Sequence, residues 1–309
     1  MTRNRGFTIL ELIVVVTIII LLLAILVPAL QMARESSRRV SCTSNLKQLG
    51  LGLLNYEASH RSFPYGQSEG GGFLVALLPF VEQEALGRQV SEFQRLNQDY
   101  ARFSFHNWLF LCPSDPGPPM IGEGSMTGSN YCGNSGASVL ISGRFDGLFR
   151  PSVDSGFGCG SVSPSHITNG LAQTSAMSEL LRANGDLDRM RVVWNTPKSF
   201  PDDHIAFARF CESLPQQPAQ AGFVGDPFCK GTPWIDGNLT VTLYNHLCTP
   251  NKPSCFNGVM VPSAATTPSS MHKGIVNMSY VDGHVTSVDE SIDRKVWIEA
   301  GMCSKHRGL

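Results

Sequence analysis

The stretch Gly6-Phe7-Thr8-Ile9-Leu10-Glu11 opens an apolar run that continues to Leu30, and this run decides how the chain is built. Written as a helix that rises about 1.5 Å per residue, the segment from Phe7 to Leu30 is about 36 Å long, enough to cross a bilayer. A short polar stretch, residues 1–6, precedes it. The sequence therefore predicts one membrane-spanning helix close to the N-terminus.

The apolar run differs from an ordinary secretory signal. Such a signal has an apolar core of about 7–15 residues and a small-residue cleavage site at its far end. Here no Ala-x-Ala-like site ends the run, and Gln31-Met32-Ala33-Arg34 continues the helical pattern. On these features alone the segment would be a plain signal anchor.

Glu11 does not fit a plain anchor, because a carboxylate inside an apolar span costs about 2.5–3.5 kcal/mol on insertion. It lies one helical turn after Phe7, on the same face of the predicted helix. If cleavage after Gly6 frees the amine of Phe7, this cation and the Glu11 carboxylate can pair in a low-dielectric setting. Pairing between neighbouring subunits would set their axial register.

The residues from Gly6 to Glu11 closely resemble the leader junction of type IV pilins and type II secretion pseudopilins. The resemblance implies that a membrane aspartic peptidase cuts after Gly6 and methylates Phe7, and that Glu11 helps recruit each subunit to its neighbour. Pro28 stands where many pilins carry a proline, which removes a backbone donor and loosens the helix locally. The implied partners are the prepilin peptidase/methyltransferase, other pilin-like subunits, an assembly ATPase and a platform protein.

Charge limits the partners and leaves the orientation open. The formal net charge of −1 offers no basic surplus for binding nucleic acid. Arg3 and Arg5 favour an inside N-terminus, but Arg34, Arg38 and Arg39 follow the span on its other side. The resemblance decides the orientation: it implies a single-pass inner-membrane protein with its C-terminal part outside the cytoplasm, and a place in a periplasmic or surface filament.

Nine cysteines are many for a cytosolic chain of 309 residues. Cys42 lies in a predicted helix, and the other eight lie in Gly/Pro-rich surroundings, where they could form disulfides in an oxidising compartment. Cys211 with Cys229, and Cys248 with Cys255, are close enough in the chain to be plausible pairs, although the connectivity stays open. A zinc site is the alternative, but no C-x2-C spacing occurs, so we favour disulfides or buried thiols.

Residues 31–58 continue the helix as an amphipathic segment. Val40, Leu46, Leu49, Leu53 and Tyr56 recur at roughly helical spacing, with charged residues between them. Two glycines, at positions 50 and 52, weaken the pattern near its end. We expect this half of the helix to pack on a sheet.

Residues 59–309 are predicted to form an extracytoplasmic globular α+β domain. Helical pattern continues from Phe73 through Gln83 to Arg95, and strands are predicted at Ala137 to Ile141 and within Thr168 to Leu181. Residues 195–270 are rich in proline and predict long, disulfide-stapled loops. The whole chain thus predicts a type IV pilin-like fold: a long N-terminal helix on an antiparallel sheet with large loop insertions.

The clearest local signal is a hairpin near the C-terminus. The segments Ile275 to Val281 and His284 to Val288 flank Asp282-Gly283. A two-residue Asp-Gly link predicts a type I′ turn, in which both central residues have positive φ.

Scattered blocks also resemble a large bacterial family of pilin-like proteins. His272, nine residues and then Asp282-Gly283 match the family's processing-associated motif, named for its co-occurrence with the prepilin leader. The resemblance is absent between about residues 195 and 265, and it implies architecture more than activity. The other blocks are Ala33-Arg34-Glu35 with Cys42, Asn45-Leu46-Lys47-Gln48-Leu49-Gly50, Asn55-Tyr56, Leu77-Leu78-Pro79-Phe80-Val81-Glu82-Gln83, Phe110-Leu111-Cys112-Pro113-Ser114-Asp115 and Ile167-Thr168-Asn169-Gly170.

Few residues suggest chemistry. His272 and Asp282 lack a third partner of obvious role, so we interpret them as loop and turn residues, and His284 as a surface residue. Asp202-Asp203-His204 reads as a solvated loop. Asn184-Gly185-Asp186-Leu187-Asp188 is similar to the start of a calcium loop, but Arg189 stands where that loop needs glycine.

We therefore predict no enzyme activity, no catalytic or metal-binding residue and no cofactor, although some pseudopilins carry calcium in C-terminal loops and a calcium site elsewhere stays open. Nucleotide-binding, HExxH and GxSxG motifs are absent.

The leading hypothesis is a structural subunit of a pilus-like or type II secretion-like (pseudopilus) assembly. The alternative is a membrane-anchored binding or display module for a ligand or surface polymer, and an anchored hydrolase is the weakest candidate. The large domain beyond the helix favours a minor, tip-located or display role over a bulk filament subunit.

Overall fold

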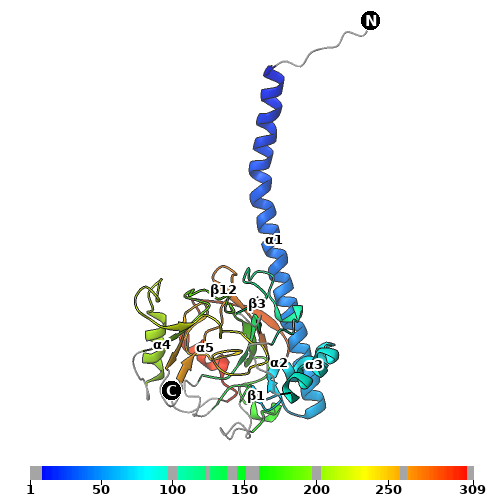
Figure 1. The fold of residues 1–309 in the computed structure, drawn as a ribbon, viewed down its shortest axis with the longest axis vertical. Coiled ribbons are helices and arrows are strands. Elements are labelled where there is room, and N and C mark those ends of the chain that lie inside the picture. The colour runs from blue at the N-terminus through cyan, green and yellow to red at the C-terminus, as the bar shows by residue number, and fades with distance from the viewer. Residues whose placement is uncertain are drawn as a thin grey trace.

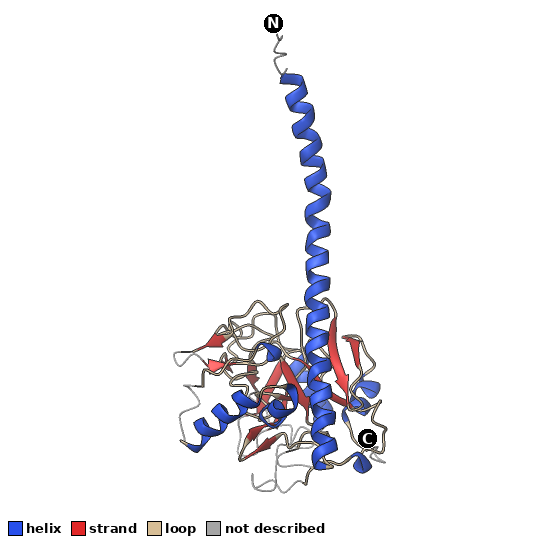
Figure 2. Ribbon diagram, turned by 90° about the vertical axis from the view of Figure 1, so that its right-hand side faces the viewer, coloured by secondary structure: helices blue, strands red, loops and turns tan. Residues whose placement is uncertain are grey.

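A single long helix, α1 (Ile9–His60), dominates the computed structural model, and its first half stands well clear of the rest of the molecule (Figure 1). The structure describes residues 9–96, 103–122, 126–137, 145–150, 160–196, 203–257 and 263–304. Figure 2 shows that the second half of α1 runs along the remainder of the chain, the head, to its far end.

The two halves of α1 have different surroundings because their sequences differ. The first half is apolar on every face, none of it is covered by the described head, and the helix is long and apolar enough to cross a membrane. Pro28 lies inside α1, and the helix continues past it. From Cys42 to Leu53 one face is buried in the head, as the amphipathic pattern predicts. Val40, predicted to belong to that face, is instead exposed.

Short elements cover the far end of α1. β1 (Gln67–Ser68) and β2 (Gly71–Gly72) pair antiparallel, and α2 (Phe73–Leu77), the 3₁₀ turn η1 (Leu78–Val81) and α3 (Glu84–Arg95) follow. These three helical elements confirm the helical pattern predicted between Phe73 and Arg95.

The central sheet has five strands in the order β13-β12-β6-β5-β9. Every neighbouring pair is antiparallel except β5 and β9, which are parallel. Its strands are β5 (Tyr131–Asn134), β6 (Ser175–Glu179), β9 (Leu243–Tyr244), β12 (Ile275–Tyr280) and β13 (Val285–Asp289).

Helices cover both faces of this sheet. Tyr131 and Met177 belong to the apolar cluster that the buried face of α1 completes. Cys132 and Met278 point into a second cluster around Trp297 of α5 (Arg294–Gly301). A long N-terminal helix packed on a largely antiparallel sheet confirms the predicted α+β, type IV pilin-like fold.

The hairpin β12–β13 forms where the sequence predicts it, but its turn is not type I′. The N–H of Gly283 donates to the Tyr280 carbonyl (2.9 Å) and the N–H of Tyr280 donates to the His284 carbonyl (2.9 Å). Gly283 has φ 86°, whereas Asp282 has no positive φ. This is a three-residue loop with glycine in the left-handed position. Val281 is fully buried, so it belongs to the loop and the core rather than to a paired strand.

Residues 195–270, predicted as long loops, contain a helix and three of the four strands of a second sheet. The sheet has the order β11-β10-β7-β8, and α4 (His204–Glu212) packs beside it with its own apolar cluster. The helix begins at a side-chain cap, because Asp203 accepts a hydrogen bond from the N–H of Ala206 (2.7 Å). The strands are β7 (Val193–Asn195), β8 (Gly225–Asp226), β10 (Ser254–Asn257) and β11 (Ser263–Ala265).

Small elements complete the head. η3 (Trp108–Phe110) and η5 (Pro164–His166) are single 3₁₀ turns, and β3 (Met120–Ile121) pairs with β4 (Met126–Thr127). Of the strand predicted at Ala137 to Ile141, only Ala137 lies within the described residues, and it follows β5 without regular structure.

The two helical glycines near the end of α1 should respond differently to alanine. A Cβ at Gly50 would lie 3.5 Å from the Cα of Gly283, an ordinary contact, whereas a Cβ at Gly52 would lie 2.5 Å from Cγ1 of Val81. Since a helix gains about 0.5–1 kcal/mol when alanine replaces glycine, Gly50→Ala should raise the free energy of unfolding by up to about 1 kcal/mol. Gly52→Ala should lower it by about 1–2 kcal/mol, because stiff, buried Val81 must move. Urea unfolding of both variants checks this, and equal effects would contradict it.

Candidate functional site: the assembly helix and its attachment to the head

The exposed half of α1 is the first part of the site. Gly6 and Phe7, the predicted cleavage and methylation residues, lie outside the described residues, and Glu11 lies in the first turn of α1 with its side chain exposed. Thr17, the other polar side chain of the span, donates to the carbonyl of Ile13 (2.8 Å) and so satisfies its hydroxyl within the helix. From Leu12 to Leu30 the exposed surface of the helix is therefore apolar, and Glu11 is the charged residue at its N-terminal end.

A disulfide fixes α1 where it enters the head. Cys42 of α1 is bonded to Cys112, whose loop follows η3, with the two Cα atoms 5.0 Å apart. The prediction that only the cysteines other than Cys42 form disulfides is therefore wrong. The reason is spatial: the Phe110-Leu111-Cys112 segment lies against α1, where the side chain of Asn45 donates to the Leu111 carbonyl (3.0 Å).

A second disulfide joins Cys211 of α4 to Cys255 of β10. The pairs suggested from chain proximity, Cys211 with Cys229 and Cys248 with Cys255, are therefore wrong, because α4 packs Cys211 against β10. Among the described cysteines four are free thiols; all are buried except Cys229, which is half-buried. They are Cys132, Cys229, Cys248 and Cys303.

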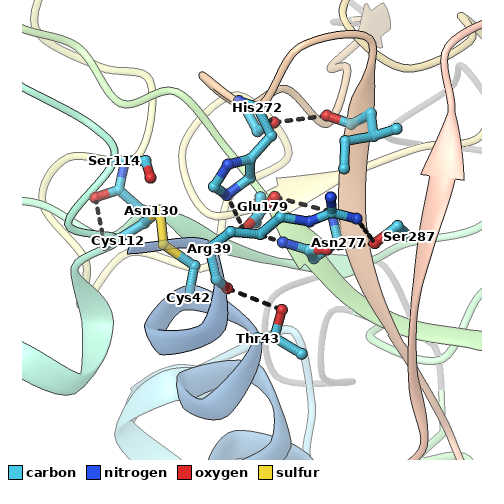
Figure 3. Close-up of polar contacts among 12 residues, drawn as sticks. Arg39, Cys42, Thr43, Cys112, Ser114, Asn130, Glu179, His272, Asn277 and Ser287 are labelled. Carbon is cyan, nitrogen blue, oxygen red and sulfur yellow. Dashed lines mark hydrogen bonds and ion pairs between the residues drawn. A yellow bond between two sulfur atoms is a disulfide. The ribbon is translucent and has the colours of Figure 1, made fainter. Parts of the chain in front are cut away.

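His272 connects α1 to the central sheet through two carboxylates, Glu35 and Glu179. Figure 3 shows its ring beside Glu179. Its Nδ1 lies 3.1 Å from Oε1 of Glu35 in α1, and its Nε2 lies 3.3 Å from Oε1 of Glu179 at the end of β6. Asn277 of β12 holds Glu179 in place, with its N–H 2.8 Å from Oε2 and its side-chain amide 2.9 Å from Oε1. Burial lowers the pKa of His272, but Glu179 and Glu35 outweigh that effect and raise it above the usual value.

The two ends of the His272 and Asp282-Gly283 motif lie on opposite ends of β12, and both touch α1. His272 meets Glu35, and Gly283 approaches Gly50 closely. Between them, the Arg39 guanidinium donates to Ser287 of β13 (2.8 Å). The motif thus attaches the hairpin to the helix at both ends of β12 and does not bring His272 and Asp282 together.

The turn residues of the motif interact locally. The Asp282 carboxylate accepts a hydrogen bond from the N–H of His284 (3.1 Å) and lies 2.5 Å from its Nδ1. His284 is exposed, as predicted, and its ring stacks on Tyr280.

The Cys112-Pro113-Ser114-Asp115 block also helps to attach α1 to the head. Ser114 donates to Glu35 (2.9 Å), while buried Asp115 lies 2.7 Å from Nη2 of Arg191 and 3.7 Å from Nε of Arg182. Burial alone would raise the pKa of Asp115, but its hydrogen bond and charge interaction with Arg191 lower it below the usual value. In the sequence, Glu35 and this block stand out only as parts of the resemblance to pilin-like proteins. Glu179 was not predicted as a site residue.

The calcium-like segment does not gather its oxygens around one point. The Asn184 side chain bonds to Asp186, Asp188 accepts from the N–H groups of Met190 and Arg191, and the Arg189 guanidinium donates to the carbonyl of Leu214. Asp203, from the other acidic segment, caps α4, of which His204 is the first residue, while Asp202 lies outside the described residues.

The exposed apolar half-helix, continued by an amphipathic half on a sheet, defines a type IV pilin-like protein. Two comparisons agree. Residues 1–27 match the prokaryotic N-terminal methylation motif, and residues 31–295 match a family described as protein of unknown function (DUF1559). The second match spans most of the chain, so the chain belongs to this pseudopilin-like family. No curated protein and no solved structure matches it significantly.

The N-terminal methylation motif defines the general role of the chain. It is a prepilin, processed by prepilin peptidase, and its mature form is a pilin-like subunit of a pilus or pseudopilus that assembles with other pilin-like subunits. The apolar half of α1 is its membrane anchor.

Proposed function

We propose that this chain is a minor subunit of a type II secretion-like pseudopilus, cut between Gly6 and Phe7 and methylated at Phe7. The observation that carries the proposal is the contrast within α1. Its second half is buried in the head, whereas its first half is apolar all round and is not covered by any described part of the chain. A helix that is hydrophobic on every face belongs in lipid or among other apolar helices.

The proposed location is the inner membrane, crossed once, with the head outside the cytoplasm. Two disulfides, one between α1 and the head and one within the head, support an oxidising compartment. An assembly ATPase and a platform protein would act on the chain from the membrane side, through α1.

The proposed assembly step uses Glu11. The amine freed at Phe7 and the Glu11 carboxylate of a neighbouring subunit would pair within the apolar layer, where an unpaired charge costs most. The pair would fix how far one helix slides along the next.

The head supports a structural rather than an enzymatic role, and a minor rather than a bulk subunit. His272 and Asp282 stand at opposite ends of β12, a strand about 20 Å long, so they do not form one reaction centre. The head also contains the second sheet and α4, which are not needed to pack against α1.

The test replaces Glu11 by valine with the leader intact, and Thr17→Val is the matched control because Thr17 is a polar residue of the same span. We expect Glu11→Val to reduce incorporation into assemblies by at least about tenfold, since the amine of the neighbour loses its partner. Thr17→Val should assemble normally, because its hydroxyl bonds only within its own helix. Cross-linking to other pilin-like subunits measures incorporation, and intact-mass analysis confirms the N-terminus at Phe7.

Wild-type incorporation of Glu11→Val would contradict the assembly role of this residue. A mature N-terminus at Met1 would contradict the proposed cleavage.

A display module is the second candidate, and the second sheet with its separate apolar cluster favours it. The same variants separate the two candidates. If Glu11→Val stays in the membrane, fails to assemble and still supports the biological process that needs this chain, display is its role.

A further inference from the structure

Four donor side chains meet where α1 enters the head (Figure 3). They are Cys42 of α1, Cys112 of the loop after η3, Glu179 of β6 and His272 before β12. All four are buried, and their two sulfur atoms, one carboxylate oxygen and one imidazole nitrogen lie within 4.8 Å of one another. Four separate segments thus direct potential metal ligands to one point.

The surroundings of the Nε2 atom of His272 are separate evidence for a metal ion bound at this point. His272 is only 4 % exposed, and this nitrogen makes no hydrogen bond to the described residues, although a Glu179 oxygen lies 3.3 Å away. The opposite nitrogen, Nδ1, lies 3.1 Å from the Glu35 carboxylate. Histidines that bind a metal through one nitrogen usually donate the other N–H to a carboxylate or carbonyl. Glu35 therefore holds the ring so that Nε2 presents its lone pair to the cluster.

The supporting contacts also fix the carboxylates. Asn277 donates to both oxygens of Glu179, and Ser114 donates to Glu35. Side chains held in this way lose little freedom when a metal binds, which favours tight binding.

Two thiolates, one imidazole and one carboxylate are the ligand types that bind zinc in tetrahedral protein sites. We propose that, when the Cys42–Cys112 disulfide is reduced, Cys42, Cys112, Glu179 and His272 bind one Zn²⁺ ion. The four segments are then joined by a metal in the reduced chain, whereas the disulfide joins two of them in the oxidised chain.

Electrons and protons balance when the disulfide state is converted into the zinc-bound state. A dithiol gives two electrons and two protons to the disulfide and becomes a disulfide itself, leaving two thiols at Cys42 and Cys112. Both thiols lose their protons to solvent as Zn²⁺ binds. The sulfur atoms then stand about 3.7 Å apart, as Zn–S bonds of about 2.3 Å in a tetrahedral site require. The Cα atoms, 5.0 Å apart, accommodate this by rotation of the two side chains.

Zinc would attach α1 to the head before the disulfide forms. A newly made chain is reduced, and at that stage only non-covalent contacts, such as that between His272 and Glu35, would hold α1 to the head beside two thiols. The zinc site does not depend on filament assembly, so it can be tested apart from the proposed function.

The experiment uses the full-length chain in detergent and Co²⁺ as the probe, because tetrahedral Co²⁺–thiolate sites absorb light whereas zinc sites do not. After reduction with a phosphine, we expect one Co²⁺ per chain with a thiolate charge-transfer band that Zn²⁺ abolishes. The oxidised protein should show no such band. Cys112→Ser should abolish it, and His272→Gln and Glu179→Gln should each weaken Co²⁺ binding at least about tenfold. The double variant Cys211→Ala/Cys255→Ala, which lacks the other disulfide, is the matched control and should bind like wild type.

A second measurement needs no variant. In the reduced wild-type chain, Zn²⁺ should slow the alkylation of Cys42 and Cys112 at least about tenfold and leave Cys211 and Cys255 unaffected, as read by peptide mass mapping. The proposal is overturned if Zn²⁺ protects neither Cys42 nor Cys112, or if the Co²⁺ band survives both Cys112→Ser and His272→Gln.

Discussion

At pH 4.5 the head should be roughly 2–3 kcal/mol less stable than at pH 7 through His246 alone. His246 is fully buried between the central sheet and α5. Its Nδ1 lies 2.8 Å from the Trp297 carbonyl and its Nε2 lies 2.7 Å from the Ser175 hydroxyl, which suits a neutral ring. Burial is the main cause that lowers the pKa of His246 to about 3, and the bond to Trp297 opposes it only in part.

The direction of this pH effect follows from the lowered pKa. The unfolded chain binds a proton at His246 below about pH 6.5, whereas the folded chain does so only near pH 3. Its contribution to stability is therefore complete above pH 6.5 and is lost as the pH falls toward 3. Lys230, whose pKa burial lowers to about 7, acts in the separate window between pH 7 and 10.5 and does not interfere.

Urea unfolding of the wild type and of His246→Gln, measured from pH 7 to pH 4.5, checks this expectation. The difference between the two proteins should shrink as the pH falls, because only the wild type carries the buried ring. His284→Gln, at an exposed histidine, is the control and should keep the wild-type pH dependence. A constant difference between wild type and His246→Gln would contradict the assignment.

Removing the Cys42–Cys112 disulfide should lower the free energy of unfolding of the oxidised chain by about 2–4 kcal/mol. The bond closes a segment of 70 residues, which in the chain-entropy account restricts the unfolded state strongly. It also ties α1 to the head at the level where the helix first becomes buried. The effect should therefore be largest in α1.

The variants are Cys42→Ala/Cys112→Ala and, as matched control, Cys211→Ala/Cys255→Ala, studied without reductant and with a metal chelator. The second bond spans 44 residues, so its global cost should be similar. Hydrogen exchange should separate them: the first pair should lose amide protection in α1 from Cys42 to Leu53, and the control in α4 and β10. Unchanged amide protection of α1 in the first variant would contradict this prediction, because the other contacts of α1 would then be enough to hold it against the head.

The fold was partly predictable, and the misses have physical causes. Helix α1 and the β12–β13 hairpin were recognisable because apolar pattern and glycine placement act between residues close in the chain. The turn type was wrong because the tertiary burial of Val281 sets the loop length. Helix α4 was missed because many prolines around it obscured the cap at Asp203.

The functional site was also only partly predictable from the sequence. His272 was predicted to be a loop residue before a strand, but its spacing to Asp282 does not indicate that it lies between Glu35 and Glu179. Metal ligands were sought as C-x2-C pairs, a pattern that detects only ligands on one short segment. Glu179 gave no local signal, because its importance comes from Asn277 and His272, each more than 90 positions away.

The sequence by itself determined that the chain is made as a prepilin with an N-terminal assembly helix. Hydrophobic length and a leader junction are properties of consecutive residues, so they can be read without a fold. Only the tertiary structure decided how that helix is held: which cysteine joins Cys42, and which carboxylates enclose His272. These contacts form between segments that the packing of the core brings together, so they cannot be read from the spacing of residues along the chain.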